Sequence, residues 1–211
     1  MSISLININA FFSFFMFPPS LGTSLILESA TAAGFVGLLA KNTWLKTVKL
    51  GLQPLEHLLP AIKSCIEETP NHEGFGSIES IVYAKSPGST LSLRVTEMFL
   101  STLLKLKPSI GLYPYNTLVL FSLQLKNTDH HLLCPKPDHS WEVLSCQASS
   151  GTMLLEVMSA SELEGLPYPL YHLPLRKKHP QLPARAQALP LLGFPSPSLF
   201  SEPLLYQIGL D

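Results

Sequence analysis

The sequence predicts an α+β protein with a weakly specified fold. Its start is almost uncharged, its middle mixes helical and alternating apolar patterns, and its end is dense in proline. Leucine is the commonest residue, with 41 copies, and it selects weakly between helix and strand because it lacks β-branching. We divide the chain into an apolar, helical N-terminal segment at 1–40, short amphipathic helices at 41–74, a small α+β unit at 75–166 and a disordered, proline-rich tail at 167–211.

Composition excludes several classes of function. Charged residues make up 14% of the chain and the net charge is −1, so no field of either sign attracts polyanions. We therefore expect no nucleic-acid partner. Three cysteines, Cys65, Cys134 and Cys146, cannot form a dense disulfide framework and favour a reducing compartment.

The N-terminal segment has the apolar character of a segment that is directed to a membrane. Residues 1–40 contain one charged side chain, Glu28. The first apolar run, at 3–17, is too short for a helix that crosses a bilayer, which needs about 20 residues. The second run, Leu21 to Ala40, has that length and is the candidate membrane segment, although Glu28 near its middle opposes insertion.

Two features bear on the orientation of such a segment. The small residues Ala30-Thr31-Ala32 offer a site for signal peptidase, which would release a secreted protein beginning after Ala32. Against cleavage, Lys41, Lys46 and Lys49 follow the run closely, and the positive-inside rule keeps such residues in the cytosol. We predict a membrane location with the bulk of the chain cytosolic, and keep cytoplasmic and secreted locations as alternatives.

Short amphipathic helices are expected next. Apolar residues recur every three or four positions between 41 and 68, namely Val48, Leu52, Leu55, Leu59, Ile62 and Ile66. Pro54 and Pro60 interrupt the pattern, so we expect two or three short helices rather than one long one. Their apolar face could lie on a membrane, on a partner or on the chain's own core, and the sequence leaves these alternatives open.

The unit at 75–166 mixes strand and helix patterns. Ile78 to Ala84 and Leu91 to Val95 read as a hairpin around the turn Pro87-Gly88. A helical pattern then runs from Val95 to Lys107. Alternation at Phe121 to Leu125, and the apolar stretches at 140–146 and 152–158, predict further strands of a small antiparallel sheet.

Chemical signatures are weak. The candidate metal ligands His130, His131, Cys134, His139 and Cys146 lie close in sequence, but their spacing lacks the tight pairs of a zinc site. No motif of a hydrolase, a nucleotide-binding loop or a dinucleotide fold is present. We therefore predict no metal, no cofactor, no small-molecule substrate and no enzymatic activity.

The tail offers one peptide motif. Lys177, Pro180, Pro183 and Arg185 fit both orientations of an SH3 ligand, in which prolines dock in aromatic grooves and a basic residue meets an acidic pocket. The leading functional prediction is a small, non-enzymatic, membrane-associated protein, or a translated reading frame without a selected function. The alternatives are a soluble interaction protein whose tail binds an SH3-type domain, and a secreted protein.

Overall fold

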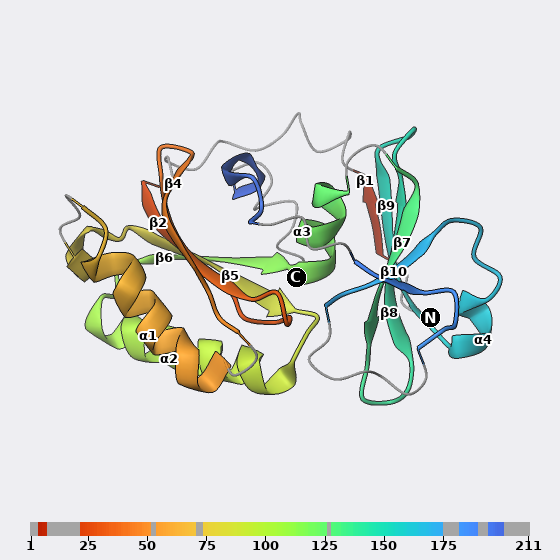
Figure 1. The fold of residues 1–211 in the computed structure, drawn as a ribbon, viewed down its shortest axis with the longest axis horizontal. Helices are drawn as coiled ribbons and strands as arrows, with labels where there is room; N and C mark the ends of the chain where they lie inside the picture. Colours follow the sequence, from red (N-terminus) through yellow and green to blue (C-terminus); the bar gives the residue numbers. More distant parts are fainter. Residues whose placement is uncertain are drawn as a thin grey trace. The chain divides into compact units, whose positions relative to one another are not determined.

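The chain folds into two units, each built on its own β-sheet (Figure 1). The computed structural model describes residues 4–7, 22–51, 54–70, 74–125, 128–174, 182–189 and 194–200. The first unit comprises Met1–Met16 and Leu118–Leu192, and the second comprises Phe17–Thr117 and Gly193–Asp211. The broad α+β class is thus confirmed.

The second unit contains a five-stranded mixed sheet. In the order β4-β3-β2-β5-β6, its strands are Thr43–Lys49, Phe35–Ala40, Thr23–Glu28, Ser80–Ser86 and Gly111–Asn116. Strands β2, β3 and β4 pair antiparallel, whereas β5 pairs parallel with both β2 and β6. The predicted strand at Ile78 to Ala84 is confirmed as β5.

The prediction of a membrane helix at Leu21 to Ala40 is wrong. Leu21 lies outside the described residues, and the rest of the run forms the hairpin of β2 and β3, in which Leu25 pairs with Leu38. Both strands are buried over nearly their whole length, which explains a continuous apolar run without alternation. No helix in the described part of the chain is long and apolar enough to cross a bilayer.

The prediction of an apolar helix at the N-terminus is therefore also wrong. The described residues there form strands, β1 (Ser4–Asn7) and β2. Ala32, the proposed cleavage point, lies in the turn between β2 and β3. A cut at Ala32 would therefore separate two strands that pair with each other in the sheet.

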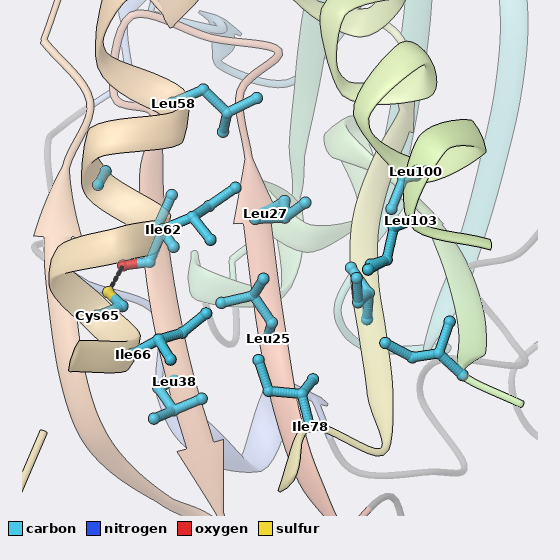
Figure 2. Packing of buried hydrophobic residues seen from close by; sticks show 14 of the residues in the cluster. Leu25, Leu27, Leu38, Leu58, Ile62, Cys65, Ile66, Ile78, Leu100 and Leu103 are labelled. Carbon is cyan, nitrogen blue, oxygen red and sulfur yellow. Dashed lines mark hydrogen bonds between the residues drawn. The ribbon is translucent and has the colours of Figure 1, made fainter. Parts of the chain in front are cut away.

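Two helices, α1 (Pro54–Glu67) and α2 (Thr90–Leu106), cover one face of this sheet (Figure 1). The core between helices and sheet is apolar and closely packed, and Figure 2 shows members of it from β2, β3, α1 and α2. These include Leu25, Leu27, Leu38, Leu58, Ile62, Cys65, Ile66, Leu100 and Leu103. The amphipathic face of α1 thus packs on the chain's own sheet.

The helical prediction over residues 41–68 holds for its second half alone. Residues 43–49 form the strand β4 instead, where Val48 pairs with Val36. Thr43, Trp44, Thr47 and Val48 are β-branched or aromatic, and such side chains suit a pleated surface. Pro60 lies inside α1 without ending it, because the packing of the neighbouring apolar residues holds the helix together.

The predicted strand at Leu91 to Val95 is also wrong. Helix α2 begins at Thr90, with Ser89 as its N-cap, so the predicted helix after Val95 is confirmed but starts earlier. Ser92 and Thr96 are buried on the helix face that meets the sheet. Their small polar side chains broke the apolar periodicity and left an apparent alternation in the sequence.

The first unit contains a six-stranded sheet in the order β1-β9-β8-β7-β10-β11. Its remaining strands are β7 (His130–Pro135), β8 (Trp141–Gln147), β9 (Thr152–Met158), β10 (Leu170–His172) and β11 (Gln187–Ala188). The predicted strands at 140–146 and 152–158 are confirmed as β8 and β9, which pair antiparallel. A small core of Leu133, Trp141, Val143, Leu163 and Leu170 lies in this unit.

Two further predictions need correction. Residues 117–124 form the helix α3 (Thr117–Gln124) rather than a strand, and residues 118–122 are all buried, so no polar face exists there. Parts of the tail predicted as disordered are regular, namely β10, β11 and a 3-10 helix, η3, at Pro197–Phe200. The short helices α4 (Ala160–Leu163) and η2 (Gly74–Ser77) complete the described elements.

Candidate functional site

The carboxyl ends of the parallel strands β2, β5 and β6 meet at one edge of the five-stranded sheet. In open α/β sheets, ligands bind at this edge, at the point where the strand order reverses. Here the order reverses at β2, because the chain continues to β3 and β4 on one side and places β5 and β6 on the other. The last residue of β2 is Glu28.

Glu28 is fully buried. Its Oε1 accepts hydrogen bonds from the backbone N–H of Ala30, at 2.9 Å, and of Thr31, at 3.2 Å. Its Oε2 accepts one from the hydroxyl of Tyr115, at the end of β6, at 2.7 Å. Burial raises the pKa of Glu28 to about 7, and these hydrogen bonds offset part of that rise.

The turn after Glu28 is clamped against the start of α2. The hydroxyl oxygens of Ser29 and Thr96 lie 2.7 Å apart, and the backbone N–H of Ser89 donates to the carbonyl of Ala30 at 2.8 Å. Gly88 approaches so closely that a Cβ there would lie 2.6 Å from the oxygen of Ala30. These contacts hold the turn against α2, and Glu28 ties the turn to β6.

The first unit contains a Ser–His pair. Ser122 Oγ and His130 Nε2 lie 2.8 Å apart, and His130 Nδ1 lies 2.8 Å from the carbonyl oxygen of Thr128. A carbonyl only accepts, so Nδ1 carries the proton and Nε2 accepts from the hydroxyl of Ser122. Burial lowers the pKa of His130, which favours the neutral imidazole. This is the order of nucleophile, base and orienting group found in acyl-transfer sites.

The suspected metal ligands are not gathered into one site. His130 and His131 are successive residues of β7 and therefore point to opposite faces of the sheet. Within the residues that the structure describes, no three His, Cys, Asp or Glu side chains are close enough to hold a metal ion. The closeness of these residues in sequence thus reflects a hairpin rather than a shared centre.

The three thiols are buried, and burial raises the pKa of each of them. Desolvation raises the pKa of Cys65 to about 11 and that of Cys134 to about 12, and it also raises the pKa of Cys146. A thiolate is the reactive form of cysteine, and little of it exists at neutral pH in such surroundings. None of the three is therefore a candidate nucleophile.

Half of the SH3-type motif can be placed. Lys177 and Pro180 lie outside the described residues. Arg185 donates from one guanidinium nitrogen to the carbonyls of Leu163, at 2.5 Å, and Leu166, at 2.8 Å. An SH3-type domain that bound the motif would have to draw Arg185 away from both carbonyls. SH3 binding stays a prediction.

The outer side of α2 exposes a stripe of large apolar residues. Leu91, Met98 and Leu106 are 57%, 72% and 79% exposed. At 100° per residue these three lie within roughly 80° of one another, so they form one line along the helix. We call this line the α2 stripe. Sequence reasoning missed it because Leu91 was placed on a strand.

Sequence reasoning also missed Glu28 and the Ser122–His130 pair. Glu28 was visible as the one charged residue in 40, and an isolated charge in an apolar run signals a buried, bonded group. Nothing in the sequence near Ser122 marks it, because its partner His130 lies on another element, β7.

Comparison with known proteins relates this fold to YeaZ. No protein-family model and no curated protein matches the chain. Among solved structures, YeaZ from Pseudomonas aeruginosa is similar, with a TM-score of 0.59 at 16% identity, covering 88% of this chain and 90% of that one. The fold is that of YeaZ. A second structure, an uncharacterized protein with similarity to peptidase YeaZ from Pseudomonas aeruginosa, matches with a TM-score of 0.58 at 16% identity, over 88% and 89% of the two chains.

The likeness to YeaZ overturns the leading functional prediction. A non-enzymatic, membrane-associated protein was expected, yet the likeness covers 88% of this chain. The prediction that the chain is no enzyme is corrected as well, because a structure described as similar to a peptidase has the same fold. The absence of a sequence motif was therefore no ground for excluding enzyme-related chemistry.

Proposed function

We propose that this chain is an enzyme-related interaction subunit with the YeaZ fold, and that it associates with a second copy of itself through the α2 stripe. The exposure of Leu91, Met98 and Leu106 carries the proposal. Fully burying a Leu or Met side chain contributes about 1.5–3 kcal/mol. Because the α2 stripe faces water, most of this stabilisation would be gained only when a partner buries these side chains.

The spacing of the stripe suits self-association. Leu91 lies seven residues before Met98, and Leu106 lies eight residues after it. At 1.5 Å per residue the two flanking residues are about 10 and 12 Å from Met98. A two-fold axis through Met98 would therefore bring Leu91 of one copy against Leu106 of the other, which is the self-complementary arrangement of a symmetric dimer.

A cytoplasmic location belongs to the same proposal. The chain's three thiols are unpaired and buried, which suits a compartment where thiols stay reduced. The SH3-type motif adds a second means of association for an interaction subunit.

Sedimentation equilibrium tests the proposed dimer. The wild-type chain should sediment as a dimer at micromolar concentrations, and Met98→Glu should shift it to a monomer by placing a charge at the axis. Val157→Glu is the matched control, because Val157 is also exposed but lies on β9. A wild-type monomer, or equal effects of the two substitutions, would overturn the proposal.

A second candidate function is acyl hydrolysis at Ser122, favoured by the Ser122–His130 pair and by the peptidase likeness of a structure with this fold. Both side chains are buried, so a local opening of the unit would have to expose them to a substrate. Ser122 Oγ would then attack a carbonyl carbon while its proton passes to His130 Nε2. His130 would then protonate the leaving group as its bond to the carbonyl breaks, and water would hydrolyse the acyl-enzyme.

A fluorophosphonate probe tests this candidate. It should modify Ser122 with loss of fluoride, and Ser122→Ala should abolish labelling while Ser145→Ala leaves it intact. Ser145 is the matched control because its hydroxyl also lies 2.8 Å from a histidine, His131. No labelling of the folded wild-type chain would exclude a serine hydrolase.

A further inference from the structure

The five-stranded sheet has a second face, opposite α1 and α2. Strand residues alternate between faces, so Val36 and Leu38 contact the helices while Phe35 and Gly37 point the other way. Phe35 is buried all the same. On this second face lies a piece of the proline-rich tail, residues 194–200, which belongs to the same unit.

Aromatic contacts and one hydrogen bond hold the tail segment. Trp44 Nε1 donates to the carbonyl of Pro195 at 2.9 Å. The ring of Phe200 lies edge-on to Trp44, with centroids 5.5 Å apart, and at 6.3 Å from Tyr115. At the other end, the ring of Phe194 lies 5.6 Å from that of Phe35.

The surface that the tail segment contacts is held in position by contacts among its own residues. Phe35 and Trp44 meet edge to face at 6.0 Å, and Gly37 lies under the Trp44 ring, which occupies the space where a Cβ would project. A larger residue at position 37 would push the indole out of place. We call Phe35, Trp44 and Tyr115 the aromatic seat.

The tail segment 194–200 contacts the aromatic seat through the rings of Phe194 and Phe200 and the carbonyl of Pro195. It begins with Phe194-Pro195 and then makes its own turn, in which the N–H of Leu199 donates to the carbonyl of Ser196 at 3.0 Å. Among the described residues, it forms no ladder with any strand of the sheet. Recognition thus rests on two aromatic ends and one carbonyl, which a short peptide can supply.

We propose that the aromatic seat is a peptide-binding site whose built-in ligand is the segment Phe194–Phe200, and that a partner's peptide of the same chemistry replaces it. That chemistry is an aromatic residue followed by proline, a one-turn spacer, and a leucine followed by a second aromatic residue. Lys49 Nζ lies 5.9 Å from the centre of the Phe194 ring, which favours an electron-rich ring at the first position. The proposal is independent of the α2 stripe.

The test uses the full chain with a protease recognition sequence in place of residues 190–193. Before cleavage, the tethered segment should exclude a dye-labelled peptide of sequence Phe-Pro-Ser-Pro-Ser-Leu-Phe, because tethering gives it a millimolar effective concentration. After cleavage, the labelled peptide should bind at least tenfold more tightly, measured by fluorescence anisotropy.

Two controls tie any binding to the seat. A peptide with both phenylalanines changed to alanine should bind at least tenfold more weakly. Trp44→Phe in the cleaved chain should weaken binding by roughly 2- to 10-fold, the loss expected for one hydrogen bond. The proposal is wrong if the cleaved chain keeps its circular dichroism but takes up no labelled peptide within a day, or binds both peptides equally.

Discussion

Glu28 shows how one residue links sequence, turn geometry and pH. It is the one charged side chain among the first 40 residues, and it lies at the end of a strand buried in the sheet. Its carboxyl group receives two backbone N–H groups of the following turn and the hydroxyl of Tyr115. Burial favours the neutral form and raises the pKa of Glu28 to about 7, so Glu28 gains or loses its proton near neutral pH.

Glu28→Gln should remove part of the pH dependence of stability. Because folding raises the pKa of Glu28 from 4.5 to about 7, the folded state binds more protons than the unfolded state between these values. The free energy of unfolding should therefore fall as pH rises through this window, by at most roughly 3 kcal/mol from this group. Urea unfolding at pH 5, 6, 7 and 8 measures the slope.

The difference between the two proteins isolates Glu28, because every other titrating group is common to both. Wild type should lose more stability than Glu28→Gln between pH 5 and pH 8. Parallel curves across this range would mean that Glu28 is already ionised in the folded chain at pH 5.

Gly37 should tolerate no side chain. Gly37→Ala places a methyl group in the space held by the Trp44 ring, and overpacking of this kind costs about 1–3 kcal/mol. Gly76→Ala is the control, since a Cβ there meets nothing within 4 Å, and it should change the free energy of unfolding by less than about 0.5 kcal/mol. Equal stabilities in urea would show that Trp44 does not depend on Gly37.

At the scale of elements, sequence periodicity predicted correctly those helices and strands whose local pattern agrees with the way they pack in the fold. Strands β5, β8 and β9 and the second half of α2 follow their local patterns. The apolar run before Ala40 could be read as a membrane helix or as two doubly buried strands, because hydrophobicity alone does not separate these structures. The structure places a turn at Ser29 to Gly34, between the two strands, and the small residues of this turn had been considered only as an alternative signal-peptidase site.

Local alternation failed at the start of α2 and in α3 for the same reason. Ser92 and Ser122 are small polar residues that are buried among apolar neighbours, so a helix in these segments looks like a two-residue repeat. The candidate sites were harder to foresee than the elements. Glu28 and Tyr115 are 87 residues apart, and only the parallel pairing of β2, β5 and β6 brings them together.

Pro60→Ala should stabilise the chain. Pro60 lies in the interior of α1 and is exposed, so its replacement restores one helical hydrogen bond without disturbing the core. Proline is about 3 kcal/mol less favourable than alanine inside a helix, and we expect a gain of about 1–3 kcal/mol. Pro108→Ala, just beyond the end of α2, should be nearly neutral. A loss of stability in Pro60→Ala would mean that the proline ring packs against the fold.

At the scale of the whole molecule, each of the two units has its own sheet and its own core. At the edge where this type of sheet binds ligands, Glu28 is bonded to Tyr115 and to the turn beside it. The unused apolar surface lies instead on the outside of α2. For this reason the proposed function is association, with Met98 at the centre of the interface.

Disulfide trapping of Met98→Cys tests that association most directly. The three native cysteines are buried and have raised pKa values, so a cysteine at position 98 supplies the one reactive thiol among the described residues. If the two-fold axis passes through Met98, mild oxidation should yield a covalent dimer in high yield, while Glu97→Cys, exposed on the same helix but 100° away from Met98 on the side opposite Leu106, should stay largely monomeric. Equal trapping of the two variants, or none, would contradict an interface at the α2 stripe.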